Sequence, residues 1–186
     1  YEFATEVPLE EIAFLEEAAR MNEELSQVGM KEKYGHAIGY TMKREMDTGF
    51  LGHSLVDEVI MRTAAASDAR MGGAPLPAMT NSGSGNQGIT ASVPVVVYAQ
   101  ELGVSRETLY RALAVSNLST IHIKAHIGTL SAYCGAVSAG CGAGAGITYL
   151  YGGGYEHIKH TLVNAMAITS GLSLIHISEP TRLLSI

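Results

Sequence analysis

Residues 80–88, TNSGSGNQG, have the composition of a ligand-binding loop. Their three glycines let the backbone approach a ligand closely, and an apolar segment of helical length follows them. Free N–H groups at the start of a helix favour an anion. No Lys follows the glycines as in a nucleotide phosphate loop, so a carboxylate fits better than ATP or NAD. The donors that we expect to bind it are Ser82, Gly83, Ser84, Gly85, Asn86 and Gln87. The alternative is an exposed, flexible turn without a ligand.

Charged residues lie just before this loop, in RTAAASDARMGG. Arg62 and Arg70 can clamp a carboxylate through paired N–H groups, with Asp68 orienting one of the two arginines. These three residues are therefore further candidates for substrate binding. The alternative is a solvated helix end that carries a charge pair.

The segment IHIKAHIG holds three side chains of interest in catalysis. His122 and His126 are four residues apart, which places both rings on one side of a helix and can hold a metal ion. Without a third ligand this pattern is weak, and exposed histidines are the alternative. Lys124 lies between them beside an uncharged segment and is a candidate general base. Extension of its amine to the surface is the alternative.

The two cysteines, Cys134 and Cys141, are seven residues apart. On one helix their Cα atoms would be roughly 10 Å apart, too far for a disulfide. A thiolate at Cys134 can ligate iron or zinc. As residues alone, both also fit small buried positions.

Hydrophobic periodicity predicts that helices position these groups, and no alternation of strands with helices appears, so the expected class is mainly α. The expected helices cover residues 8–28, 31–47, 53–71, 89–103 and 105–124, with an amphipathic one over 155–171. Residues 125–155 contain no Asp, Glu, Lys or Arg, and their length would allow a membrane span. Nine glycines there give weak hydrophobicity, so we expect a buried central helix instead.

Composition and net charge limit the kinds of partner that we expect. A chain of 186 residues fits one domain, and its net charge of −6, without a run of Lys or Arg, argues against nucleic acid or an anionic membrane as the partner. We therefore expect a small substrate. The unpaired cysteines, and a start without the basic and apolar segments of a signal peptide, predict a cytoplasmic location.

Taken together, residues 62–99 and 121–146 resemble the C-terminal half of the L-cysteine desulfidase family, which is related to the iron–sulfur L-serine dehydratase alpha chain. The pieces that carry the resemblance are SDARMGG, NSGSGNQGI and LSAYCGA, in that order, and the resemblance covers residues 1–171. It implies a helical domain of the serine dehydratase alpha-chain type.

The resemblance also implies a lyase with a [4Fe–4S] cluster held by three cysteines. One iron acts as a Lewis acid on the leaving thiol or hydroxyl while a base removes the α-proton. L-Cysteine would give pyruvate, ammonia and sulfide; L-serine, the alternative substrate, would give pyruvate and ammonia. Cys134 corresponds to the first cluster ligand and Cys141 to a non-ligand. A helical domain that only binds a small anion is the alternative from another class.

The end of the chain departs from the family pattern. Residues 172–186, LSLIHISEPTRLLSI, resemble the translation of a sequencing adapter. Leu174 and Thr181 stand where the other two cluster cysteines are expected, and the family's N-terminal CTEP element is absent. We therefore expect residues 1–171 to be a fragment that neither completes a cluster nor turns over. We also expect it to expose apolar surface through which copies can associate.

Overall fold

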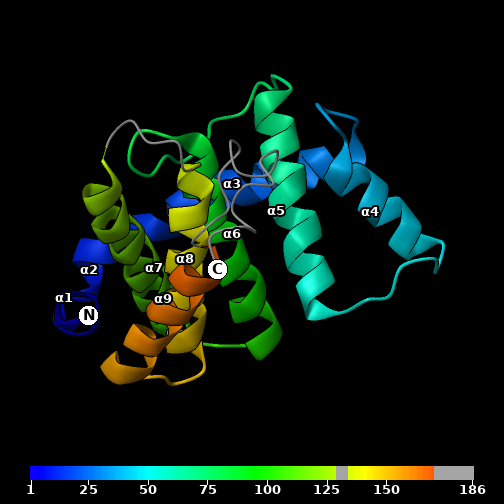
Figure 1. Cartoon of the computed structure of the whole chain (residues 1–186). Helices are drawn as coiled ribbons and strands as arrows, with labels where there is room; N and C mark the ends of the chain where they lie inside the picture. The colour runs from blue at the N-terminus through cyan, green and yellow to red at the C-terminus, as the bar shows by residue number, and fades with distance from the viewer. Residues whose placement is uncertain (129–133, 170–186) are drawn as a thin grey trace, which may run out of the picture.

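The computed structural model describes residues 1–128 and 134–169, which form a helical bundle (Figure 1). The helices are α1 (Glu2–Glu6), α2 (Leu9–Ile12), α3 (Phe14–Lys31), α4 (Ile38–Asp47), α5 (Leu55–Met71), α6 (Gly85–Leu102), α7 (Arg106–Ile127), α8 (Gly135–Leu150) and α9 (Tyr155–Thr169). Within these residues the only β-type pairing is one isolated bridge between Asn81 and Ser84. The prediction of a mainly α protein is confirmed.

Helix α6 lies in the middle of the bundle (Figure 1). Helix α5 packs on one side of it, with α4 at the outer edge, and α7 and α8 pack on the other side. Helix α3 contacts both α5 and α6, and α9 contacts α8. In the described part of the chain no helix is long and apolar enough to cross a membrane.

The core consists of two groups of buried apolar side chains that meet at α6. One group joins Val95 of α6 to Leu113 of α7 and Ala145 of α8. The other joins Ile89 and Val93 of α6 to Leu25 of α3. The residues of the two groups interleave along α6, with Val97 in the second group lying beyond Val95 in the first, so they occupy different faces of the helix. Burial of both faces fixes how the α3–α5 and α7–α8 parts are placed.

Helices α7 and α8 approach each other closely through small residues. A Cβ atom added at Gly142 of α8 would lie 2.5 Å from the carbonyl oxygen of Ser116 on α7, well inside contact distance. The nearby hydroxyl of Thr120 donates to that same carbonyl at 2.8 Å. The glycines that weaken the hydrophobicity of residues 125–155 thus allow close helix packing.

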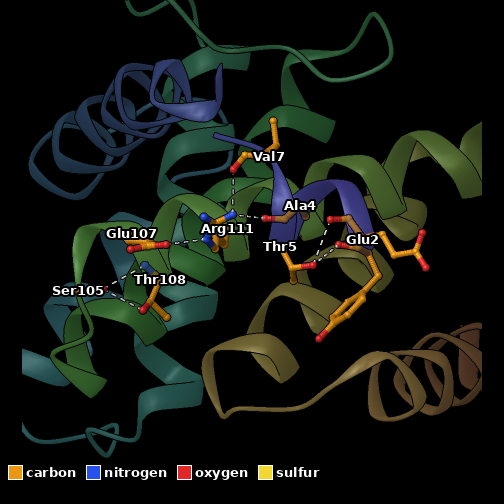
Figure 2. A network of polar contacts seen from close by, with 9 residues as sticks. Glu2, Ala4, Thr5, Val7, Ser105, Glu107, Thr108 and Arg111 are labelled. Atoms are coloured by element: carbon orange, nitrogen blue, oxygen red, sulfur yellow. Dashed lines mark hydrogen bonds and ion pairs between the residues drawn. The ribbon is translucent and has the colours of Figure 1, made fainter. Parts of the chain in front are cut away.

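A single arginine ties the N-terminal segment to α7 (Figure 2). The Nη1 group of Arg111 donates to the carbonyl oxygens of Ala4 at 3.0 Å and Val7 at 3.3 Å. Its Nε group donates to Glu107 at 2.9 Å. Helix α7 itself begins as predicted, because the Ser105 hydroxyl accepts from the backbone N–H of Thr108.

Two helix predictions were wrong. The helix expected over 31–47 begins only at Ile38, because Gly35 (φ 51°) and Ala37 (φ 54°) have left-handed backbone conformations that a helix cannot contain. Residues 125–155 do not form one helix either: α7 continues to Ile127, Gly128 (φ 90°) ends it, and α8 begins at Gly135. Helix α6 begins at Gly85, four residues before the predicted start, so the end of the glycine-rich segment is helical.

Candidate substrate-binding site

The glycine-rich segment forms a tight turn directly before α6. The backbone N–H groups of Asn81 and Ser84 each donate to the other's carbonyl, at 3.1 and 3.0 Å. Between them, Ser82 (φ 50°) and Gly83 (φ 80°) have left-handed backbone conformations. The Ser82 hydroxyl donates to the Asn81 side chain at 2.8 Å, which supports the strained residue locally. The turn therefore has a defined shape.

Two buried asparagines from other helices hold this turn in place. The Oδ1 atom of Asn22, on α3, accepts from the backbone N–H of Met79 at 3.0 Å, and its Nδ2 group donates to Ser92 at 2.9 Å. The Oδ1 atom of Asn117, on α7, accepts from Nδ2 of Asn81 at 2.9 Å. The turn is thus anchored to α3, α6 and α7, which differs from the flexible turn considered as the alternative.

Beyond the tip of the turn lies a groove of about 390 Å³. Asn81 and Ser82 line one edge, and the other walls are mainly apolar, with exposed Phe14, Leu118 and Ile121. These side chains are part of the exposed apolar surface that the sequence led us to expect.

The first turn of α6 carries unpaired backbone donors. Ser84 precedes the helix, yet its hydroxyl makes no capping hydrogen bond. In the described residues no acceptor bonds the backbone N–H groups of Gly85, Asn86 or Gln87. Three free N–H groups at the start of an 18-residue helix favour an anion.

Arg70 lies against this helix start. Its Nη1 group donates to Oδ1 of Asn86 at 3.1 Å. A Cβ atom added at Gly85 would lie only 2.1 Å from the Arg70 Nε, so the guanidinium occupies the space that a side chain would take. In the described part of the chain no carboxylate forms an ion pair with Arg70. A positive charge without a counter-charge thus stands beside three free N–H groups.

Gln87 contacts the start of α8, which therefore lies next to the start of α6. A Cβ atom added at Gly135 would lie 2.1 Å from the Nε2 atom of Gln87, so the two first turns touch. Gln87 is only 5% exposed, and its Oε1 atom is buried without a hydrogen-bond partner in the described structure. Cys134 is exposed and occupies the N-cap position of α8, where its side chain makes no capping hydrogen bond. In Figure 1, α6 and α8 begin at the same end of the bundle.

The structure does not bring Arg62 to this site. Its guanidinium bonds Glu23 and, at 2.8 Å, Oε1 of Gln100 near the far end of α6. Thirteen residues of helix separate Gln100 from Gln87, which is roughly 20 Å. A clamp made by both arginines is therefore absent, and among the described residues Arg70 is the arginine that reaches the helix start.

Asp68 contacts α4 and forms no ion pair with Arg70. Its Oδ2 atom accepts from the backbone N–H groups of Ile38 at 2.6 Å and Gly39 at 3.2 Å. Because Ala37 has no side chain that could cap α4, Asp68 supplies the cap from α5.

We expect Asp68→Ala to lower the free energy of unfolding by about 1 to 2 kcal/mol, because it removes the cap of α4. Hydrogen exchange of the Ile38 and Gly39 amides should accelerate, while affinity for a carboxylate ligand should stay unchanged. If ligand affinity fell while amide exchange stayed unchanged, Asp68 would instead orient Arg70 for ligand binding.

The histidines and Lys124 lie on the last turns of α7. His122 and His126 are exposed, and their rings meet edge to face with centroids 4.7 Å apart. Among residues 1–128 and 134–169 no three His, Cys, Asp or Glu side chains are close enough to hold a metal ion. Lys124 is half-buried, and in the described structure no hydrogen bond joins it to Arg70 or Gln87. Leu174, Thr181 and the adapter-like segment lie outside the described residues.

The two asparagines that anchor the turn were missed by sequence reasoning. Asn22 follows Ala18 and Ala19 and precedes Leu25 on the buried side of α3. A polar residue at the centre of an apolar helix face signals a buried hydrogen-bonding group. Asn117 carries the same signal on α7.

Comparison with known proteins finds relatives over nearly the whole chain. A family model described as serine dehydratase alpha chain matches residues 2–173. The chain belongs to that family. Its relatives include UPF0597 proteins of Aeromonas hydrophila, Shewanella woodyi and Photobacterium profundum, which are 47%, 49% and 51% identical over 172 residues. These alignments cover 92% of the chain but 40% of each relative, so the chain spans about two fifths of their length. No solved structure matches.

Only Cys134 among the described residues suits the iron–sulfur cluster associated with the serine dehydratase alpha chain family. Its thiol is exposed at the start of α8, where a cluster could reach it. Cys141 is buried in α8, and burial raises the pKa of its thiol, which keeps it protonated. The described side chains thus offer one cluster ligand and do not complete a cluster.

Proposed function

We propose that this chain is the substrate-binding part of an amino-acid lyase, and that the full-length protein converts L-cysteine to pyruvate, ammonia and sulfide by α,β-elimination. The observation that supports the proposal is the unpaired guanidinium of Arg70 beside the free N–H groups of α6. Such a pair of groups suits a carboxylate, which every amino-acid substrate carries.

In this proposal the residues around the start of α6 have different roles. The backbone N–H groups of Gly85, Asn86 and Gln87 and the guanidinium of Arg70 bind the carboxylate. The turn at Ser82 and Gly83 sets the direction in which α6 begins, and Ser84 leaves the helix N–H groups open to the ligand. Arg62 and Asp68 support the fold instead, through Gln100 and α4 respectively.

Catalytic roles extend the proposal beyond the carboxylate. Cys134 would be the one ligand in these residues to a [4Fe–4S] cluster of the full-length protein, since its thiol is exposed at the start of α8. Lys124 remains our candidate base, because no ion pair holds its amine in the described structure. The location that fits an enzyme with an exposed, oxidisable thiol is the reducing cytoplasm.

L-Serine is the second candidate substrate. The description of the matching family model, serine dehydratase alpha chain, favours it. The two substrates differ only in the leaving group, a thiol or a hydroxyl, and Arg70 and α6 would bind the same carboxylate in both.

The experiment uses the full-length protein that contains these residues. We expect anaerobic reconstitution to produce iron–sulfur absorbance and pyruvate from L-cysteine, with L-serine assayed in parallel. Cys134→Ser should lose the absorbance and the pyruvate, because it removes a cluster ligand. The matched variant Cys141→Ser should keep both. Absence of pyruvate from either amino acid would favour a domain that only binds a small anion.

A further inference from the structure

Gln87 holds a buried acceptor that nothing in the described fold uses. The residue is 5% exposed, and its Oε1 atom has no hydrogen-bond partner. Leaving a buried acceptor unpaired is unfavourable, and such groups in native proteins call for an explanation such as a ligand. The atom lies where the first turns of α6 and α8 meet, because the Gln87 amide packs against Gly135.

The surroundings of this acceptor consist mainly of donors. Both helices present their N-terminal ends there, and Arg70 lies against Gly85 and Asn86 in the same first turn of α6. The side-chain oxygen of Asn86 already accepts from Arg70 at 3.1 Å. Oε1 of Gln87 is therefore the buried side-chain acceptor that remains free at the start of α6 in the described structure.

We propose that Gln87 Oε1 accepts a hydrogen bond from the α-ammonium group of the substrate, so that this site selects α-amino acids against carboxylates that lack a donor at the α position. The inference rests on the proposed function, because it places the substrate carboxylate at Arg70 and the start of α6. Gln87 thus supplies a backbone N–H for the carboxylate and a side-chain oxygen for the ammonium.

The neutral amide also suits this position better than a carboxylate would. An Asp or Glu at position 87 would place a second negative charge at the start of α6 and compete with the substrate carboxylate for that end of the helix. Glutamine offers an acceptor without that competition. The site can then bind both charges of a zwitterion at neighbouring points.

The test measures binding by titration calorimetry to the 186-residue chain. L-Serine and 3-hydroxypropionate differ only in the ammonium group, which 3-hydroxypropionate replaces with a hydrogen atom. We expect Gln87→Leu to weaken L-serine binding by about 10-fold or more and to leave 3-hydroxypropionate binding within about 2-fold. Gln27→Leu, at an exposed position of α3, is the matched control and should change neither.

Equal loss of both ligands in Gln87→Leu, or no loss of either, would overturn the role of Gln87. Failure of the unmodified chain to bind either ligand would overturn it as well. If Gln87→Leu does not fold by circular dichroism, Gln87→Met, which keeps the side-chain length, replaces it. Pyruvate formation by the full-length protein is measured in a separate assay. Selective binding of L-serine without pyruvate formation would refute the proposed lyase activity, while the contact between Gln87 and the ammonium group would still be supported.

Discussion

Arg70→Met is expected to weaken L-serine binding by about 100-fold while leaving the melting temperature of the chain nearly unchanged. A hydrogen bond to a charged group contributes about 1.5 to 3 kcal/mol, and a guanidinium can make two to one carboxylate. Stability should change little, because Arg70 has no ion-pair partner in the described structure and bonds only Asn86 and Met71. Calorimetric titration and thermal unfolding measure the two effects.

Two further variants test whether the loss of affinity depends on the place of Arg70 at the start of α6. Arg44→Met removes an exposed arginine that pairs with Glu45, and it should leave the affinity unchanged. Gly85→Ala keeps the guanidinium but moves it, because the added Cβ would lie 2.1 Å from the Arg70 Nε. It should weaken binding in the same direction as Arg70→Met. Unchanged affinity in Arg70→Met would exclude this arginine from the carboxylate site.

Gly142→Ala is expected to lower the free energy of unfolding by about 3 kcal/mol. The new Cβ would lie 2.5 Å from the Ser116 carbonyl oxygen and 2.1 Å from the Thr120 hydroxyl, so α7 and α8 must separate. Overpacking of a well-packed core typically costs 1 to 3 kcal/mol, and backbone atoms on the far side cannot move aside cheaply. Urea denaturation measures the change.

The matched control is two residues away in the same helix. Gly140→Ala meets no atom within 4 Å, so it should raise the free energy of unfolding by about 0.5 to 1 kcal/mol through helix propensity alone. If both substitutions stabilise the protein, the close contact between α7 and α8 would be refuted.

Local signals in the sequence predict much of this fold. Ser54 and Asp57 form a capping box and Ser105 caps α7, so α5 and α7 begin within two residues of where periodicity places them. The interruption between α7 and α8 was missed because glycines and alanines fit a helix, a loop or a close contact equally well. Only the packing of α8 against α7 and α6 decides where the break falls.

The candidate site was partly accessible from the sequence. Glycines before an apolar run, with an arginine nearby, indicate an anion site, and Arg70 does lie at the start of α6. A shared clamp with Arg62 contradicts the helix predicted over 53–71, because eight residues of helix place the two arginines roughly 12 Å apart along its axis. The contact between Gln87 and Gly135 joins residues 48 positions apart, which no local pattern reveals.

The anchoring of the turn by Asn22 and Asn117 has a consequence for rates as well as for affinity. A loop that is ordered by its own protein does not lose conformational entropy when a ligand arrives, so the ligand's contacts appear almost fully as affinity. Association then needs no slow rearrangement of the turn, and dissociation governs the differences between similar ligands. Loosening either asparagine would make this site slower to load without changing any group that touches the ligand.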